Sequence, residues 1–288
     1  MTQLQLGYVQ FNPRFGEPAW NRRRLAELIR RAPRADLLVL PELCVSGYHF
    51  ENWQQAWALS EPVTRDAETV RMLHTLAQET DVTLVAGYNE RGRGTDEVLY
   101  NSAVVVTPRD GLIGAYRKLH LFNTEKSFFT QGDRFRLFDL PLREGGQGSG
   151  ALTARLGVLI CYDWAFPETW RTMMLMGADV IAHPSNLVLP GKAQAAVPVM
   201  AMMNRMAVVT ANRYGEERGL RFTGESLIAG PDGTVLAHAR PDADDVGTAI
   251  VSLQKIRDRR VTERNHALAD RRPGLYAPIC EEREEDRE

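Results

Sequence analysis

Cysteine, net charge and long apolar runs are all scarce in this chain of 288 residues. Its three cysteines, Cys44, Cys161 and Cys280, lack the number of a disulfide framework and the spacing of a zinc site. The formal net charge of −2 argues against a surface for nucleic acid or acidic membranes. No apolar run approaches the roughly 20 residues that span a bilayer, and no signal segment opens the chain. We expect a cytoplasmic protein with reduced thiols and without a metal, nucleic acid or membrane.

What the chain does contain is two halves that resemble each other. Hydrophobic residues make up 44% and charged residues 25%, which is ordinary for a globular protein. Residues 35–42 resemble residues 178–185, and residues 6–10 resemble residues 156–160. Such matches are short, but they follow the same order in both halves, which argues against chance.

Each half reads as strand, helix, strand, helix, strand and hairpin. Apolar stripes at helical spacing predict the helices, and Asp-Gly turns predict hairpins over residues 102–115 and 226–237. Pro198 is expected in the first turn of the fourth helix, residues 198–206, where its missing N–H costs little. Two sheets, each covered by helices on one face, bury their bare faces against each other. We therefore predict an α/β fold, a four-layer α-β-β-α sandwich with two pseudo-symmetric halves.

We expect a single domain over residues 1–280, because no linker rich in proline, glycine and serine separates the halves. The charged residues 281–288 are predicted to form a flexible tail. The glycine-rich segment 144–150 lacks the Lys-Ser/Thr ending of a phosphate-binding loop, so we interpret it as a surface loop.

The segment 156–168 holds the first candidate for chemistry. An apolar run ends on Cys161, and Pro167 then leads into a helical pattern. A thiol at the C-terminal end of a buried strand lies where α/β folds expose reactive groups. The following helix N-terminus is expected to favour the thiolate. Taken alone, a buried cysteine is more often a small hydrophobic residue.

Two charged residues at the ends of apolar strands are the next candidates. Glu42 ends an almost wholly apolar strand, where a carboxylate needs a partner or a raised pKa, and this indicates a general base. Alternation along the strand puts Tyr116, Lys118 and His120 on one face. An inward lysine needs a carboxylate such as Glu42 or Glu125. The alternatives are a loop-pinning glutamate and an exposed edge-strand lysine.

Three blocks resemble the signatures of the nitrilase (carbon–nitrogen hydrolase) superfamily, in its amidase/carbamoylase-like branch. They are residues 41–43, 117–122 and 161–168, in the family's order. Secondary blocks agree at residues 125–133, 183–186, 211–215 and 222–228. The resemblance covers residues 4–252 and implies the same sandwich fold and a homodimer or higher homo-oligomer.

The resemblance also implies a catalytic triad of Glu42, Lys118 and Cys161, with Glu125 positioning the lysine and substrate. This triad would hydrolyse a small carboxamide to a carboxylic acid and ammonia through a cysteine thioester, without a cofactor. The backbone N–H of Tyr162 is expected to help stabilise the developing oxyanion.

The substrate is the least determined part of the prediction. Asn186 is a candidate for substrate positioning, and Tyr48, Trp164 and Phe166 are candidates for pocket lining, with Trp53 beside them. The Cys-Tyr-Asp block resembles amidases and carbamoylases more than nitrilases. Ala165 stands where branches acting on anionic amides have arginine. A substrate carboxylate would then need another partner.

Arg213 and Arg205 are the two candidates for such a partner. Without one, neutral aliphatic or aromatic carboxamides are the predicted substrates. The alternatives that stay open are an N-carbamoyl amide hydrolase or a nitrilase with the same triad, an acyltransferase, and a non-catalytic interaction protein. A Cys–His scheme through His120 or His183 is a further mechanistic alternative.

Overall fold

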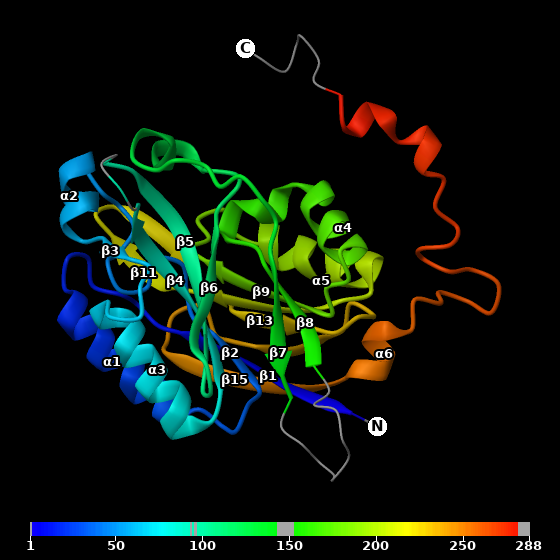
Figure 1. The fold of residues 1–288 in the computed structure, drawn as a ribbon, viewed down its shortest axis with the longest axis horizontal. Helices are drawn as coiled ribbons and strands as arrows, with labels where there is room; N and C mark the ends of the chain where they lie inside the picture. The colour runs from blue at the N-terminus through cyan, green and yellow to red at the C-terminus, as the bar shows by residue number, and fades with distance from the viewer. Residues whose placement is uncertain (1, 93, 95–96, 143–152, 282–288) are drawn as a thin grey trace.

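The computed structural model describes residues 2–92, 94, 97–142 and 153–281. The glycine-rich segment 144–150 and all of the predicted tail except Glu281 lie outside the described residues. The described chain forms two mixed sheets packed face to face, with α1 and α3 on one side and α4 and α5 on the other (Figure 1). This arrangement confirms the predicted four-layer sandwich. Among the described residues no helix is long and apolar enough to cross a membrane.

The first half supplies most of the first sheet and two long helices. Its elements are β1 (Gln3–Gln10), α1 (Pro18–Arg31), β2 (Leu37–Val39), α2 (Trp53–Ala58), β3 (Glu61–Pro62), α3 (Glu68–Thr80), β4 (Thr83–Arg91), β5 (Leu99–Thr107) and β6 (Gly111–Arg117). The predicted hairpin over residues 102–115 is the antiparallel pair of β5 and β6.

The second half repeats this order and adds a small hairpin. Its elements are β7 (Leu137–Pro141), β8 (Thr153–Val158), α4 (Pro167–Leu175), β9 (Val180–Ser185), α5 (Lys192–Asn204), β10 (Ala207–Asn212), β11 (Tyr214–Glu217), β12 (Leu220–Thr223), β13 (Leu227–Ala229) and β14 (Val235–His238). The chain continues through β15 (Asp245–Ser252) and α6 (Leu253–Arg257). Short 3₁₀ turns lie at η1 (Asn123–Ser127), η2 (Cys161–Ala165), η3 (Pro273–Leu275) and η4 (Ala277–Ile279).

The two sheets have matching strand orders. The first runs β15-β1-β2-β4-β5-β6, with β3 pairing β4, and the second runs β14-β13-β10-β9-β8-β7. In each sheet three central strands are parallel, and an antiparallel strand flanks them on each side. β15 pairs with β1, and β7 occupies the equivalent position beside β8. β15 comes after the repeated segments in the sequence, whereas β7 comes before those of the second half. The internal repeat predicts neither strand, because both lie outside the repeated segments.

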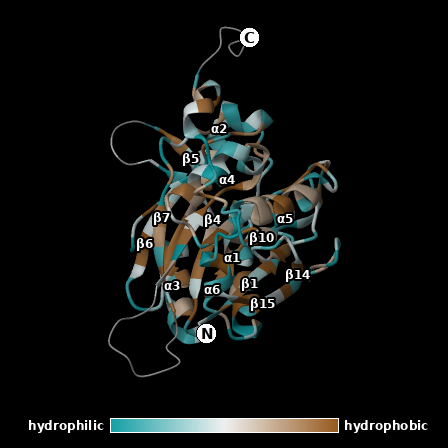
Figure 2. Cartoon of the chain, turned by 90° about the vertical axis from the view of Figure 1, so that its right-hand side faces the viewer, coloured by the Kyte–Doolittle hydropathy of each residue, from teal (hydrophilic) through white to brown (hydrophobic). Residues whose placement is uncertain are grey.

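The core divides by face, as period-two alternation requires. Leu4, Leu6 and Tyr8 of β1 point between the sheets, whereas Val9 packs with the helices on the outer face. On the other side of the molecule, Trp170 of α4 joins the outer core of the second sheet. Figure 2 shows hydrophobic colour concentrated on the strands and more hydrophilic colour on the surrounding loops. The two packed sheets therefore hold the segments at their strand ends in place.

The expected position of Pro198 is wrong. The helix begins at Lys192, so Pro198 lies inside α5 rather than in its first turn. An internal proline removes one backbone hydrogen bond and costs about 3 kcal/mol. The helix starts earlier because three of the six residues before Pro198 are alanine, a strong helix former, and because Ala193 and Val197 are buried.

Candidate active site

Glu42 is held at the end of the first sheet by a close backbone crossing. β2 ends at Val39, and the following turn buries Glu42 completely. β4 passes this turn at Gly87, whose N–H donates to Pro41 O at 3.1 Å. A Cβ at Gly87 would lie 2.3 Å from Glu42 Cα, so only glycine permits this approach. The sheet thus fixes the carboxylate through its backbone.

Lys118 joins two buried glutamates. It follows β6 directly, and its Nζ donates to Glu42 Oε1 at 2.7 Å and to Glu125 Oε1 at 2.8 Å. Asn101 Nδ2 donates to the same Glu42 oxygen at 2.7 Å. The hydroxyl of Tyr48 donates to Glu125 Oε1 at 2.7 Å. Glu42 Oε2 is buried and has no hydrogen-bond partner within the described part of the chain.

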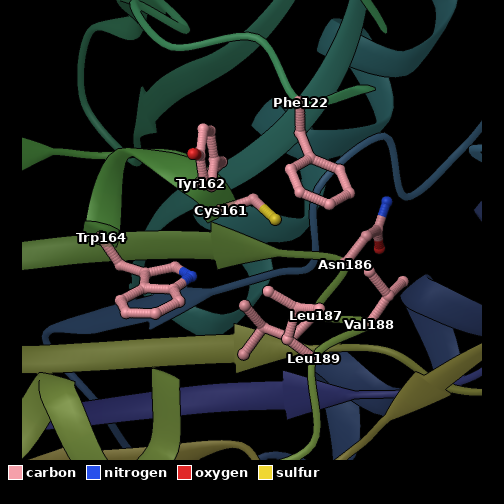
Figure 3. A pocket seen from close by; sticks show the side chains of 8 residues that line it. All are labelled: Phe122, Cys161, Tyr162, Trp164, Asn186, Leu187, Val188 and Leu189. Atoms are coloured by element: carbon pink, nitrogen blue, oxygen red, sulfur yellow. The ribbon is translucent and has the colours of Figure 1, made fainter. Parts of the chain in front are cut away.

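Cys161 opens onto a small pocket at the end of the second sheet. It begins η2 with a φ of 42°, a left-handed conformation typical of a residue held in a sharp turn. Figure 3 shows its sulfur among the side chains of Phe122, Tyr162 and Asn186. The pocket encloses about 280 Å³ of empty space, part of it open to solvent. Its lining residues are Phe122, Cys161, Tyr162, Trp164, Asn186, Leu187, Val188 and Leu189.

Comparison with known proteins identifies the scaffold that carries this site. The family model described as "Carbon-nitrogen hydrolase" matches residues 5–261. The chain belongs to the carbon–nitrogen hydrolase family. This confirms the resemblance seen in the signature blocks.

Individual relatives cover almost the whole chain. A protein of Pyrococcus abyssi named "Nitrilase" is 45% identical and spans 95% of this chain and 99% of its own length. An "(R)-stereoselective amidase" of a Pseudomonas species is 35% identical, spanning 83% and 82%. The crystal structure of a carbon–nitrogen hydrolase from Helicobacter pylori is 25% identical, with a TM-score of 0.80 over 97% of this chain and 99% of that one.

In this carbon–nitrogen hydrolase the cysteine is not a resting thiolate. Burial and the neighbouring Glu42 carboxylate raise the pKa of Cys161 well above its ordinary value, against the opposing effects of Lys118 and the Asn186 backbone N–H. The N-terminus of α4 was expected to favour the thiolate of Cys161. Burial outweighs this effect, because η2 separates the thiol from α4. Burial also raises the pKa of Glu42, with a further rise from Glu125 and an opposing effect of Lys118. The thiol therefore needs a base at the moment of reaction.

Lys118 carries the fixed positive charge of the site. Burial works against its charged form, but the carboxylates of Glu125 and Glu42 raise its pKa above the ordinary value. A buried ammonium between two carboxylates stays protonated and keeps its geometry. Lys118 thus suits charge stabilisation rather than proton transfer.

The two histidines of the Cys–His alternative are engaged elsewhere. His183 Nε2 lies 2.9 Å from the backbone oxygen of Cys161, and its Nδ1 lies 3.0 Å from Thr210 Oγ1. Burial lowers the pKa of His183 to about 4, so its ring is neutral near pH 7. His120 Nδ1 lies 2.7 Å from Asp163 Oδ1. These contacts support the Glu–Lys–Cys arrangement over a Cys–His pair.

The predicted aromatic lining is only partly brought together. Trp164 lines the pocket. Tyr48 instead turns its hydroxyl to Glu125, and Phe166 stacks on the ring of His120 with centroids 3.8 Å apart. Trp53 stacks on Trp57, 4.9 Å between centroids.

Neither arginine considered as a carboxylate partner lines the pocket. Arg213 is fully buried and pairs with Glu217 Oε2 at 2.6 Å. Arg205 lies at the C-terminal cap of α5 and donates to the backbone oxygen of Asp258 at 3.3 Å. Among the described residues, no cluster of three or more His, Cys, Asp or Glu side chains could hold a metal ion.

Several site residues are absent from the expectations drawn from sequence. Asn101 orients Glu42, and Leu187, Val188 and Leu189 form an apolar pocket wall. Asn101 does leave a signal, since it is a buried polar residue in the apolar strand β5. Residues 187–189 come soon after β9, but nothing in their sequence pattern distinguishes pocket-lining residues from core residues.

Proposed function

We propose that this chain is an amidase that cleaves small neutral carboxamides to a carboxylic acid and ammonia through a thioester on Cys161. The observation that carries the proposal is the bridge of Lys118 between Glu42 and Glu125 beside the buried thiol. Burial and the Glu42 carboxylate keep the Cys161 sulfur protonated. Glu42 Oε2, which has no hydrogen-bond partner among the described residues, is available to accept its proton. The reaction uses no metal or organic cofactor in this scheme.

Glu42 moves the proton in both halves of the reaction. The Cys161 thiol gives its proton to Glu42 Oε2 as the sulfur attacks the amide carbon. Glu42 then returns this proton to the amide nitrogen, so that the C–N bond breaks and ammonia leaves. In the second half Glu42 takes a proton from water, whose oxygen attacks the thioester carbon. The C–S bond then breaks, Glu42 returns the proton to the Cys161 sulfur, and the acid leaves.

Two groups are suited to the negative charge that develops on the substrate oxygen. Lys118 Nζ supplies a fixed ammonium, held by Glu42 and Glu125. The backbone N–H of Tyr162 donates to no acceptor among the described residues, and Tyr162 lines the pocket. Preorganised donors of this kind contribute about 10²–10³-fold each to the rate.

Asn186 is suited to the amide nitrogen of the substrate. Its Nδ2 donates to the backbone oxygen of Glu42 at 3.0 Å, which fixes the orientation of the side-chain amide. Its Oδ1 is buried and has no hydrogen-bond partner within the described chain, and Asn186 lines the pocket. A buried acceptor of this kind favours a substrate N–H and disfavours analogues that lack one.

The pocket walls support a neutral acyl group. Cys161 apart, the lining side chains are aromatic, aliphatic and amide, with no charged group among them. Ala165 supplies no cation, and Arg213 is consumed by its pair with Glu217. A substrate carboxylate placed here would be desolvated without a partner. The name of the Pseudomonas relative, a stereoselective amidase, agrees with an amide substrate.

Nitrile hydrolysis is the second candidate, favoured by the 45% identical relative named "Nitrilase". The same thiol adds to a nitrile carbon to give a thioimidate. One water converts it to a thioester and ammonia, and a second water releases the acid and the free thiol. A nitrile has no N–H for Asn186 Oδ1, so the site favours the amide of the same acyl group.

A matched substrate panel tests the proposal. The primary amide, nitrile, N-carbamoyl amine and methyl ester of one acyl group are compared by product release, with Cys161→Ala as the control. We expect the amide to have the highest kcat/KM and Cys161→Ala to abolish it. Faster turnover of the nitrile or carbamoyl compound would reassign the substrate, and no release from any compound would indicate a non-catalytic protein.

The ester isolates the contact of Asn186. Asn186→Ala removes the acceptor, so we expect a loss in kcat/KM for the amide about 10-fold larger than for the ester. Equal losses would mean that Asn186 acts only through its hydrogen bond to the Glu42 backbone.

We also propose a homodimer or larger homo-oligomer. Large apolar side chains are exposed on the outer helices of the second half: Leu175, Met176, Val199, Met202 and Met203. An apolar patch of this kind is typical of an association surface. Light scattering after gel filtration should give at least twice the chain mass, and Met202→Glu should lower it. A monomeric wild type would contradict this expectation.

A further inference from the structure

Asp163 is a buried carboxylate that accepts three hydrogen bonds and contacts a histidine ring nitrogen beside the proposed active site. Its Oδ2 accepts from Tyr116 Oη at 2.8 Å and from Ile160 N at 2.9 Å. Its Oδ1 accepts from His120 N at 3.0 Å and lies 2.7 Å from His120 Nδ1. Asp163 is fully buried and does not line the pocket.

The donors come from both sides of the sandwich. Tyr116 and His120 lie two residues before and after Lys118, at the end of β6 in the first sheet. Ile160 directly precedes Cys161, at the end of β8 in the second sheet. One carboxylate therefore ties the segment that carries the ammonium to the segment that carries the sulfur.

We propose that Asp163 is a positioning residue that sets the placement of Cys161 relative to Lys118 and Glu42. The proposal rests on the proposed function, because it assigns those three residues to the chemistry. The left-handed turn at Cys161 costs about 1–3 kcal/mol and persists only if its surroundings hold it. The bond from Ile160 N to Asp163 holds this turn at the residue before the nucleophile.

A carboxylate suits this position because Tyr116 Oη, Ile160 N and His120 N donate to it, and an ionised carboxylate favours the tautomer in which His120 Nδ1 donates as well. Two carboxylate oxygens offer acceptor sites for four donors, whereas an asparagine amide would turn an NH₂ group toward two of them. Asp163→Asn keeps the volume and removes half of the acceptor capacity. Since Asp163 does not touch the substrate, the loss should appear in kcat rather than in KM.

Asp179 provides a matched control within the same sheet. It is also buried and also accepts a backbone N–H, that of Arg155, at 2.9 Å, as well as the guanidinium of Arg257 at 2.8 Å. It precedes β9, at the strand end opposite His183 and Ser185. Asp179→Asn therefore removes a comparable buried carboxylate without touching the reactive strand ends.

The experiment measures turnover, thiol alkylation by iodoacetamide and thermal stability for Asp163→Asn and Asp179→Asn. We expect Asp163→Asn to lower kcat by about 100-fold with little change in KM, as for a misplacement of about 1 Å. Alkylation of Cys161, followed by mass spectrometry, should slow as well, because the sulfur loses its alignment with Glu42. Asp179→Asn should lower stability and leave both rates within about 3-fold.

Tyr116→Phe keeps the proposal testable if Asp163→Asn fails to fold. It removes one of the hydrogen bonds to Asp163, so we expect a loss in kcat of roughly 10-fold. Equal losses of activity in the Asp163 and Asp179 variants, or an unchanged kcat in Asp163→Asn or Tyr116→Phe, would overturn the positioning role. The alkylation rates decide it even if no amide is a substrate, so its failure is distinguishable from that of the proposed function.

Discussion

The two halves of the molecule share a backbone frame, but their strand ends carry different residues. Leu6 pairs with Leu37 in the first sheet as Leu156 pairs with Val180 in the second. Five residues beyond these pairs, Glu42 corresponds to Ser185 and Cys161 corresponds to Phe11. The strand arrangement is therefore repeated in the two halves. The residues proposed for catalysis, Glu42 and Cys161, are not repeated at the equivalent positions.

The lysine follows the same rule. Lys118 N donates to Asn101 O at 2.8 Å, and Ala239 N donates to Ser226 O at 2.8 Å after the second hairpin. The residue equivalent to Lys118 is thus an alanine. The buried Lys118 and Glu42 cost desolvation that the equivalent Ala239 and Ser185 do not. At these equivalent positions, buried charge therefore lies on one side only.

Among equivalent positions, Cys161 and Phe11 should differ most in the effect of a substitution on kcat. Cys161→Ala removes the nucleophile, and we expect a loss in kcat on the order of 10⁶-fold. Phe11→Leu changes only core packing, so kcat should hold while the free energy of unfolding falls by about 1 kcal/mol. Steady-state kinetics and chemical denaturation measure both. Substantial turnover by Cys161→Ala would remove the basis of the proposed mechanism.

The next comparison is between Glu42 and Ser185. Glu42→Gln keeps the shape but cannot take the thiol proton, so kcat should fall by about 10³-fold. Ser185→Ala should cost no more than about 10-fold, the worth of one neutral hydrogen bond. A Ser185 variant as impaired as the Glu42 variant would show that both frames contribute to catalysis.

The pH profile of the wild type gives a second measure of Glu42. The base must be ionised to accept a proton, and burial raises its pKa above the ordinary 4.5. Activity should therefore fall as the pH drops through a value above 4.5, and Glu42→Gln should lose this acid limb. An acid limb that persists unchanged in Glu42→Gln would assign the proton transfer to another group.

This comparison also explains how far the sequence could predict the structure. The repeated segments predicted both sheets and their helices, because the alternation of apolar residues is local. Glu42 and Cys161 were visible because each ends an apolar run, and Lys118 because strand alternation placed it on the inner face; the resemblance to the family's signature blocks joined the three. The contacts of Asn101 and Asp163 were not, because they depend on how segments distant in the sequence meet.

The same reasoning applies to the pocket and the edge strands. Tyr48 was expected in the pocket lining, but its hydroxyl satisfies Glu125, and no spacing in the sequence sets that direction. β7 and β15 pair with the first strand of each half from segments outside the repeat. Each pairs with the sheet edge that the repeated strands leave open, and no local pattern in the sequence specifies that pairing.

A smaller effect is expected where the two frames are alike. Asp36 Oδ2 accepts from Gln5 N at 2.7 Å, and Asp179 Oδ2 accepts from Arg155 N at 2.9 Å, at equivalent strand starts. Asp36→Asn and Asp179→Asn should each lower the free energy of unfolding by about 1–3 kcal/mol and leave kcat unchanged. Urea denaturation measures the pair, and a large loss in only one would show that the halves differ in their scaffold as well.

The smallest expected effect concerns Cys44, a buried thiol two residues from Glu42 that lies outside the proposed chemistry. Its Sγ donates to Gly87 O at 3.3 Å, and burial raises its pKa from 9.0 to about 12. A pKa that is higher in the folded than in the unfolded state adds stability that is complete below pH 9 and is lost as the pH rises toward 12. Between pH 8 and 10 the wild type should therefore lose about 1 kcal/mol more of its unfolding free energy than Cys44→Ala does. Denaturation curves at the two pH values measure this difference. Identical pH dependence in both proteins would mean that the Cys44 thiol titrates as freely in the folded chain as in the unfolded one.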